Sequence, residues 1–276
     1  MSNQGWQEWR IVPLAPPTWA RGTSWDRMPS KAVARLLTTM ALAALLLPAD
    51  AHAGPPYVTD DPEPVPYRHW ELYLAAVPDL AHDGVTSTAP HIEINYGPVP
   101  GVQLHTIVPL AYARPKGGPA QYGPGDIELG AKVRFVEEGR VMPMIGTFPL
   151  LELPIGNASK GLGSGHVHGF IPLWLQKSMG DFTTYGGAGY WLNPGNGNRS
   201  YWLVGWMLQR RLSERIALGL EVYYTTPEEP DGSSNLRFNL GLVLDASEHH
   251  HMLMSAGRSI VGDHVFQSYL AYQLTL

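Results

Sequence analysis

The chain has 276 residues, and its composition excludes most classes of soluble protein. Charged residues make up only 16% of it, against about 25% in ordinary globular proteins, and 30 glycines with 25 prolines require many turns. Cysteine is absent, which excludes disulfides, Cys-based zinc sites and thiol nucleophiles. No apolar stretch reaches the roughly 20 residues of a membrane-spanning helix, so a helical membrane protein is excluded as well.

The first 53 residues have the form of an export signal. Lys31 and Arg35 precede the apolar stretch 36–47, and the triplet 51–53 (Ala-His-Ala) offers a signal-peptidase site before Gly54. Met28 heads a signal peptide of ordinary proportions, so we interpret residues 1–27 as an over-extended start and 28–53 as a cleaved signal. The alternative is a short N-terminal core helix. After cleavage the chain would carry 14 basic and 21 acidic residues, and this negative balance argues against nucleic-acid binding.

After Gly54 the sequence alternates with a period of two, which is typical of half-buried β-strands. In 125–135 one face carries Ile127, Leu129, Ala131, Val133 and Phe135, and the other carries Asp126, Glu128, Gly130, Lys132 and Arg134. Segments 215–224 and 235–245 follow the same rule. The other predicted strands are 69–77, 91–97, 102–113, 141–153, 169–178, 182–192, 200–211, 251–259 and 265–276.

The predicted connections between these strands alternate in length. Short ones cover 98–101, 137–140, 179–181, 212–214 and 246–250, and longer ones rich in Gly, Pro, Asn and Ser cover 78–90, 114–124, 154–168, 193–199 and 225–234. An even number of strands, with short turns at one end and longer loops at the other, is typical of an outer-membrane barrel with periplasmic turns and outside loops. A soluble β-sandwich would explain the alternation but not the loop asymmetry. We therefore assign 54–68 to a periplasmic segment that leads into the barrel, and 69–276 to the barrel.

The last strand has the form of a barrel-closing strand. Between Ser268 and Leu276, apolar and other residues alternate to the end of the chain, which resembles the assembly signal of bacterial outer-membrane proteins. Leu276 stands where that signal usually has Phe or Trp.

The chain also resembles the MetA-pathway of phenol degradation family of outer-membrane proteins. The likeness rests on residues 59–62 (Thr-Asp-Asp-Pro), on 123–134 (Gly-Pro-Gly-Asp-Ile-Glu-Leu-Gly-Ala-Lys-Val-Arg) and on 153–156 (Leu-Pro-Ile-Gly) before a Gly-rich loop. It implies an outer-membrane barrel of a Gram-negative bacterium that moves small, aromatic or hydrophobic compounds.

Charged residues on the polar faces are candidates for the barrel lumen, because a Lys or Arg facing lipid near the membrane centre would cost about 2–4 kcal/mol. The candidates for selectivity in the lumen are Glu71, Glu93, Asp126, Glu128, Lys132, Arg134, Lys177, Glu221 and Arg237. About twelve strands would leave a narrow or plugged pore. These charges could select a solute or could simply neutralise one another across the lumen.

Two other sets of residues point only weakly to chemistry. His249, His250 and His251 lie in a predicted turn, and His166 and His168 in a predicted loop, so we interpret them as solvated rather than as metal ligands. Ser164 lies beside His166, but no Gly-x-Ser-x-Gly motif or supported Ser-His pair is present.

We therefore predict an all-β protein, an antiparallel transmembrane β-barrel of about 12 strands with short periplasmic turns and longer outside loops. We expect a narrow channel or transporter for small solutes, without catalytic residues, metal or cofactor. A structural outer-membrane barrel without transport is the second hypothesis, and an outer-membrane acyl hydrolase the third. The expected partners are outer-membrane lipid, the barrel-assembly machinery and a small-molecule solute, with no nucleic acid.

Overall fold

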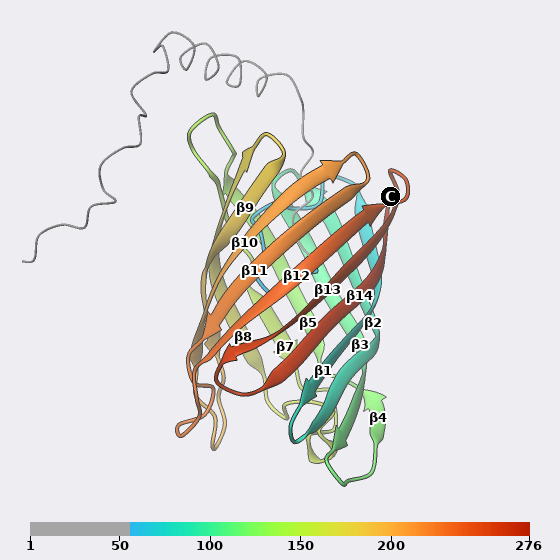
Figure 1. The fold of residues 1–276 in the computed structure, drawn as a ribbon, viewed down its shortest axis with the longest axis vertical. Helices are drawn as coiled ribbons and strands as arrows, with labels where there is room; N and C mark the ends of the chain where they lie inside the picture. Colours follow the sequence, from blue (N-terminus) through green and yellow to red (C-terminus); the bar gives the residue numbers. More distant parts are fainter. Residues whose placement is uncertain (1–55) are drawn as a thin grey trace, which may run out of the picture. The chain divides into compact units, whose positions relative to one another are not determined.

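The computed structural model describes residues 56–276 and shows a closed antiparallel β-barrel (Figure 1). The predicted signal peptide and its cleavage site lie outside these residues. Within 56–276, no helix is long and apolar enough to cross a membrane.

The described part of the chain forms fourteen strands and one turn of 3-10 helix at Ala158–Lys160. The strands are β1 (Trp70–Ala81), β2 (Gly84–Val99), β3 (Val102–Pro115), β4 (Gln121–Pro124), β5 (Ile127–Val136), β6 (Met144–Thr147), β7 (Leu150–Leu153), β8 (His168–Met179), β9 (Phe182–Leu192), β10 (Tyr201–Ser213), β11 (Ile216–Thr225), β12 (Asn235–Asp245), β13 (His250–Val261) and β14 (Val265–Thr275).

The sheet closes because β1 pairs with both β2 and β14, the last strand of the chain. Two wall positions are each shared by two strands. Both β4 and β5 pair with β3, and both β6 and β7 lie between β5 and β8. The fourteen strands therefore build a barrel of 12 wall positions, which confirms the predicted strand number.

The period of two predicted the two faces of the wall correctly. At the middle of β12, Leu240 is 59% exposed on the outside, whereas Asn239 is 1% exposed on the inside. The tryptophans divide between the faces: Trp70, Trp202 and Trp206 are exposed, but Trp174 is buried and Trp191 packs against the buried Phe170. The apolar side chains lie outside and the polar ones inside, which is the inverse of their distribution in a soluble barrel.

Apart from shifts of one to three residues at strand ends, the strand boundaries differ from the prediction in three places. Residues 78–90, predicted as a long loop, extend β1 and β2 to a turn at 82–83, with Pro78 opposite Ser87 and register shifts beside this hairpin. Residues 121–124 form β4 rather than loop, and 141–153 is divided into β6 and β7 by Phe148 and Pro149. Proline and glycine were interpreted as loop signals, but bulges and strand breaks accommodate them within the wall.

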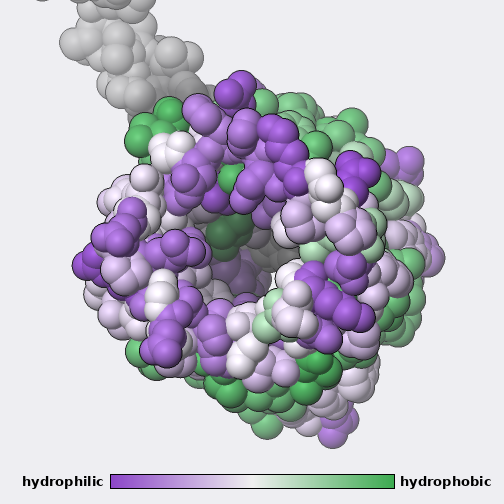
Figure 2. All heavy atoms as spheres, turned by 90° about the horizontal axis from the view of Figure 1, so that it is seen from below, coloured by the Kyte–Doolittle hydropathy of each residue, from purple (hydrophilic) through white to green (hydrophobic). Residues whose placement is uncertain are grey.

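The two ends of the barrel differ. The chain ends at the upper end in Figure 1, where short turns follow β2, β8, β10 and β12; we call this the short-turn end. The opposite end carries the loops 154–167, 193–200 and 226–234, and we call it the long-loop end, although the connections 82–83 and 262–264 there are short. Seen from the long-loop end, the barrel has a central hollow surrounded mostly by hydrophilic residues (Figure 2).

Candidate functional site: a plugged lumen

The lumen near the short-turn end is filled by residues 56–66, which we call the plug segment. Three inward-facing side chains bind its backbone. Gln103 Oε1 accepts a hydrogen bond from the Val65 N–H at 2.9 Å, and Ser255 donates to the Pro56 carbonyl at 2.6 Å. Glu221 accepts from the N–H groups of residues 58 and 59. The segment that we assigned to a periplasmic lead into β1 therefore turns into the barrel, and its contacts span β3, β11 and β13.

The wall is shaped to hold this segment. At five inward-facing glycines a Cβ atom would collide with the plug segment: Gly97 with Val65 and Pro66, Gly146 with Pro62, Gly205 with Thr59, and Gly219 and Gly241 with the Tyr57 hydroxyl. Glycine inside a strand often marks a close approach of another part of the chain. The plug segment therefore fits the wall on five different strands.

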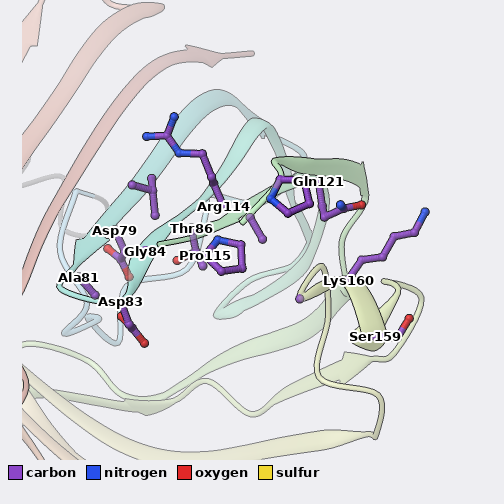
Figure 3. Close-up of a pocket in the computed structure, with 14 residues that line it drawn as sticks. Asp79, Ala81, Asp83, Gly84, Thr86, Arg114, Pro115, Gln121, Ser159 and Lys160 are labelled. Atoms are coloured by element: carbon purple, nitrogen blue, oxygen red, sulfur yellow. The ribbon is translucent and has the colours of Figure 1, made fainter. Parts of the chain in front are cut away.

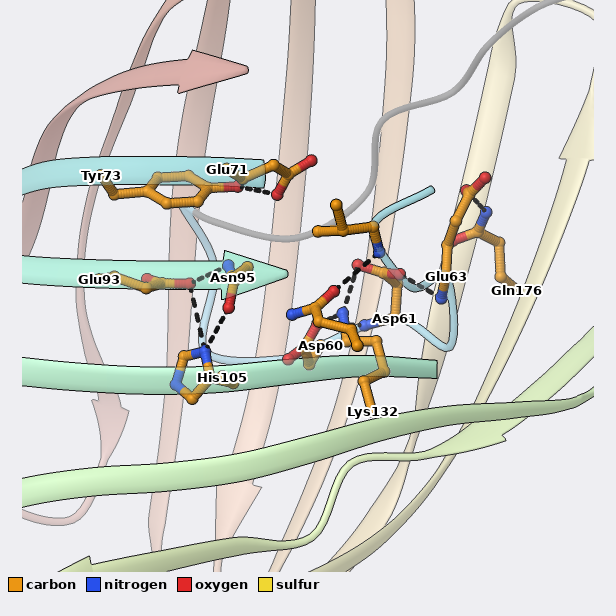
Figure 4. Close-up of polar contacts among 12 residues, drawn as sticks. Asp60, Asp61, Glu63, Glu71, Tyr73, Glu93, Asn95, His105, Lys132 and Gln176 are labelled. Atoms are coloured by element: carbon orange, nitrogen blue, oxygen red, sulfur yellow. Dashed lines mark hydrogen bonds and ion pairs between the residues drawn. The ribbon is translucent and has the colours of Figure 1, made fainter. Parts of the chain in front are cut away.

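An ion pair anchors the middle of the plug segment (Figure 4). Lys132 Nζ, on β5, lies 2.9 Å from Asp60 Oδ1 and 3.5 Å from Asp61 Oδ2. Lys132 is 4% exposed, and Asp61 is fully buried. Burial raises the pKa of the Asp61 carboxyl, and the neighbouring Lys132 ammonium opposes that rise. Glu63 extends the anchor, because its carboxylate accepts a hydrogen bond from Gln176 on β8 at 2.9 Å.

A second network lies beside the plug segment on β2, β3 and β5. Asn95 donates to Glu93 at 2.8 Å, and its carbonyl oxygen lies 2.7 Å from His105 Nδ1 (Figure 4). The other ring nitrogen of His105 lies 2.8 Å from Glu128 Oε1. Each polar group therefore has a partner, as buried polar groups require. The arrangement holds two carboxylates at the side of the lumen.

A neighbouring part of the lumen wall is aromatic, and it adjoins the second network where the Phe148 ring meets His105 at 5.0 Å. The Phe170 and Trp191 rings stack with centroids 4.7 Å apart, and Trp191 and Tyr201 lie parallel at 6.2 Å. Trp174 follows Phe170 at 6.2 Å toward the short-turn end. Phe148 joins the same buried cluster. Apart from Phe148, which lies between β6 and β7, these rings form a row on β8, β9 and β10 from the long-loop end to the level of the plug segment.

The nine predicted lumen residues lie in three environments. Glu93, Glu128, Lys132 and Glu221 belong to the buried networks described above, and Glu71 accepts a hydrogen bond from Tyr73 nearby. At the short-turn end, Arg134 pairs with Glu137 at 2.7 Å and Lys177 with Glu138 at 2.9 Å. Toward the long-loop end, Asp126 binds the 154–167 loop and Arg237 contacts Gln267 at 3.4 Å. Their role in selectivity stays a prediction.

The sequence analysis missed the plug segment and its glycines. By the alternation in 215–224 and 235–245, Gly219 and Gly241 lie on the polar faces of their strands, and this small-residue signal on two neighbouring strands could have indicated a close approach. The alternation itself carries no information about what fills the lumen.

His249 and His250 are exposed, as interpreted from the sequence, but His251 is buried on β13 rather than solvated, and His168, His251 and Ser164 have structural partners. His168 lies 3.3 Å from Glu152, and His251 lies 2.7 Å from Asp245. Among residues 56–276, no group of three or more His, Cys, Asp or Glu is arranged to hold a metal ion. The Ser164 hydroxyl lies 2.7 Å from Asp126 Oδ2 and 2.9 Å from the His166 carbonyl oxygen, and it can donate its one hydrogen to either, so it stabilises the loop.

Comparisons with known proteins agree with the fold. No family model matches the chain, and no curated protein matches it either, so the resemblance to the MetA-pathway family stays a prediction. Among solved structures, the COG4313 outer membrane channel from Pseudomonas putida F1 has a TM-score of 0.63 at 14% identity, covering 78% of this chain and 98% of that one. The KdgM porin has a TM-score of 0.49 at 11% identity, covering 74% and 98%. The first likeness places this chain's fold among outer-membrane barrels.

Proposed function

We propose that this protein is an outer-membrane channel for small solutes. The observation that carries the proposal is the inverted barrel: its outer face is apolar, while its inner face carries charged and polar side chains. A closed barrel pairs its backbone groups around the wall, which lipid requires. The proposed location is the outer membrane of a Gram-negative bacterium, reached through a cleaved signal peptide. The barrel-assembly machinery would insert it there.

The proposed solutes are small, and they include aromatic or hydrophobic compounds. Twelve strands lie between the eight that side chains can fill and the sixteen or more of an aqueous porin. The plug segment narrows the lumen further. The row of Phe170, Trp191 and Tyr201 gives an entering apolar solute a surface to move along, and the polar network of His105 adjoins the same aromatic cluster at Phe148. Passage then requires the plug segment to move or to leave a narrow path beside it.

A structural barrel without transport is the second candidate, and the plug segment is the observation that favours it. Residues 56–66 match the wall so closely, at glycines on five strands, that they could serve only to fill the barrel and stabilise it. The two candidates differ in what removal of the segment does. A channel should open wider, whereas a structural barrel should lose stability without gaining a selective path.

Planar-bilayer recordings and liposome solute flux test the proposal. The full chain should show a small conductance, and a variant lacking residues 57–65 should show a larger one with faster flux of small aromatic compounds. A matched deletion of 228–232, in an exposed loop between β11 and β12, should conduct like the parent. If the parent and the plug deletion both assemble but pass neither ions nor solutes, the structural candidate replaces the channel.

A further inference from the structure

A cavity of about 430 Å³ lies on the long-loop side of the plug segment, between β1, β2, β3, β5 and the 154–167 loop. We call it the acidic chamber. It adjoins an outer cavity of about 550 Å³, the vestibule, because Asp79, Thr86 and Gly161 line both. The vestibule lies between the β1–β2 hairpin, β3, β4 and the 3-10 turn (Figure 3). A solute that enters from the long-loop end on this side would meet the vestibule first.

The balance of positive and negative side chains differs between the two cavities. The vestibule is mixed, with Asp79, Asp83, Arg114 and Lys160 in its lining, and the Lys160 side chain extends away from the others (Figure 3). The acidic chamber is lined by four carboxylates and an imidazole but by no Lys or Arg: Asp79, Asp126, Glu128, Glu152 and His91. A low-dielectric wall focuses the field of such like charges into the space that they surround.

None of these four carboxylates has a Lys or Arg partner within 4 Å in residues 56–276. Asp126 accepts hydrogen bonds only from neutral groups of the loop, the N–H groups of Gly156 and Ser164 and the Ser164 hydroxyl. Glu128 and Glu152 lie beside imidazoles. The side chain of Asp79, at the junction of the two cavities, makes no hydrogen bond or ion pair with any described residue, although its backbone belongs to the β1 ladder. Its carboxylate is therefore available to a ligand.

The inward-facing cations that could neutralise the chamber are mostly held elsewhere. Lys132 is paired with the plug segment, and Arg134 and Lys177 are paired with turn glutamates at the short-turn end. Arg237 is the exception. It contacts Gln267 at 3.4 Å and lies close enough to Asp79 to act on it electrostatically. One guanidinium and the imidazoles beside Glu128 and Glu152 do not balance four carboxylates, so the chamber keeps a net negative charge.

The same chamber has an apolar wall. Val77, Ile107, Pro109, Ala111 and Leu162 contribute to its lining. Leu162 is buried against Ala111 and Ala113, so the loop presents this side chain to the inside of the barrel. A volume of about 430 Å³ lies within the range of small-molecule sites. The chamber therefore offers hydrocarbon surface and carboxylate oxygens to one small ligand.

We propose that the acidic chamber binds small organic cations with an apolar body, such as protonated alkylamines, and disfavours carboxylates of the same shape. The proposal deepens the channel function and rests on it for its biological use. Asp79 is the main specificity residue, since it is unpaired and stands where a solute passes from the vestibule. Glu152 assists, because a ligand cation can compete with His168 for its carboxylate.

Calorimetric titration of the purified, folded full chain tests this with three probes that share one ring: cyclohexylmethylamine, cyclohexylmethanol and cyclohexanecarboxylate. At neutral pH these are a cation, a neutral alcohol and an anion. The amine should bind at least tenfold more tightly than the carboxylate, with the alcohol between them. Asp79→Asn should reduce the amine preference several-fold, and Asp79→Asn with Glu152→Gln should abolish it. Asp231→Asn, in an exposed loop, should leave it unchanged.

Each contrary result overturns the proposal. Equal or tighter binding of the carboxylate would reverse the assigned charge preference, and absence of binding by all three probes would remove the site. An amine preference that survives the double variant would place the binding outside the chamber. The gel shift between boiled and unboiled samples verifies that each variant forms the barrel. Because the assay measures binding and not conductance, its failure leaves the bilayer test of the channel intact.

Discussion

Replacing Lys132 by Met is expected to release the plug segment from the lumen. Lys132 is the cation that compensates Asp60 and Asp61, at 2.9 and 3.5 Å. Removing one partner of a buried ion pair typically costs about 3–5 kcal/mol, because the remaining charge stays buried without compensation. The Asp60 side chain is 23% exposed, so we expect the lower end, about 3 kcal/mol. At 1.36 kcal/mol per tenfold change, the undocked population should rise about a hundredfold.

Thiol labelling measures this release directly, because the natural chain has no cysteine. A Thr59→Cys substitution places one thiol on the plug segment at a position that is fully buried. A small maleimide should label it slowly in the parent and about a hundred times faster with Lys132→Met, in proportion to the undocked population. Lys160→Met, in the 3-10 turn, is the matched control and should not change the rate.

A neutral triple variant separates the ion pair from the loss of the lysine itself. Combining Lys132→Met with Asp60→Asn and Asp61→Asn removes the uncompensated charges, so labelling should slow again toward the parental rate. The reasoning is refuted if Lys132→Met labels within threefold of the parent. It is equally refuted if the triple variant labels as fast as the single one.

Three further substitutions and one sequencing experiment test other features of the chain. Leu240→Arg places a charge against lipid at a cost of about 2–4 kcal/mol, so it should abolish the gel shift of the folded barrel. The control Thr86→Arg, in the vestibule, should retain that gel shift. Asp126→Asn weakens three hydrogen bonds to the 154–167 loop, so amide hydrogen exchange in that loop should accelerate by roughly tenfold or more. The exchange rates of the strands should not change. Gly205→Val collides with the plug segment and should increase conductance; an unaltered conductance would mean that the segment does not limit flow. N-terminal sequencing of membrane-extracted protein should begin at Gly54, and a retained apolar stretch would contradict the cleavage site.

Sequence alone predicted the wall well, because the wall is specified locally. In β5 and β12 every second residue is apolar, and the cost of placing a charge in lipid fixes which face turns outward. The predicted range 235–245 and the observed β12 are identical. The prediction was wrong at 78–90, where the local signal of Pro78, Gly84 and Pro90 indicated a loop. Strand pairing with distant residues decided that segment instead.

The plug segment was beyond this kind of prediction, because its contacts join residues far apart in the chain. The Val58 N–H and the Glu221 carboxylate are separated by 163 positions, and Ser255 and Pro56 by 199. An alternating pattern predicts that Glu221 faces inward. It does not predict whether the carboxylate contacts solvent, an arginine or a backbone N–H. The inward glycines carry part of that information, yet a glycine in a strand also marks bulges and bends.

The net charge of the pore depends on which inward-facing side chains are already paired with an opposite charge. From the inward-facing residues alone, Lys132, Arg134 and Lys177 count as cations that a passing solute would meet, and the lumen looks nearly balanced. The structure assigns all three to carboxylates of the plug segment or of the short turns. The carboxylates toward the long-loop end keep only imidazoles and neutral donors as partners. A solute that has passed the mixed vestibule therefore meets net negative charge, because the plug segment and the turns hold these three cations and Arg237 alone does not balance the carboxylates.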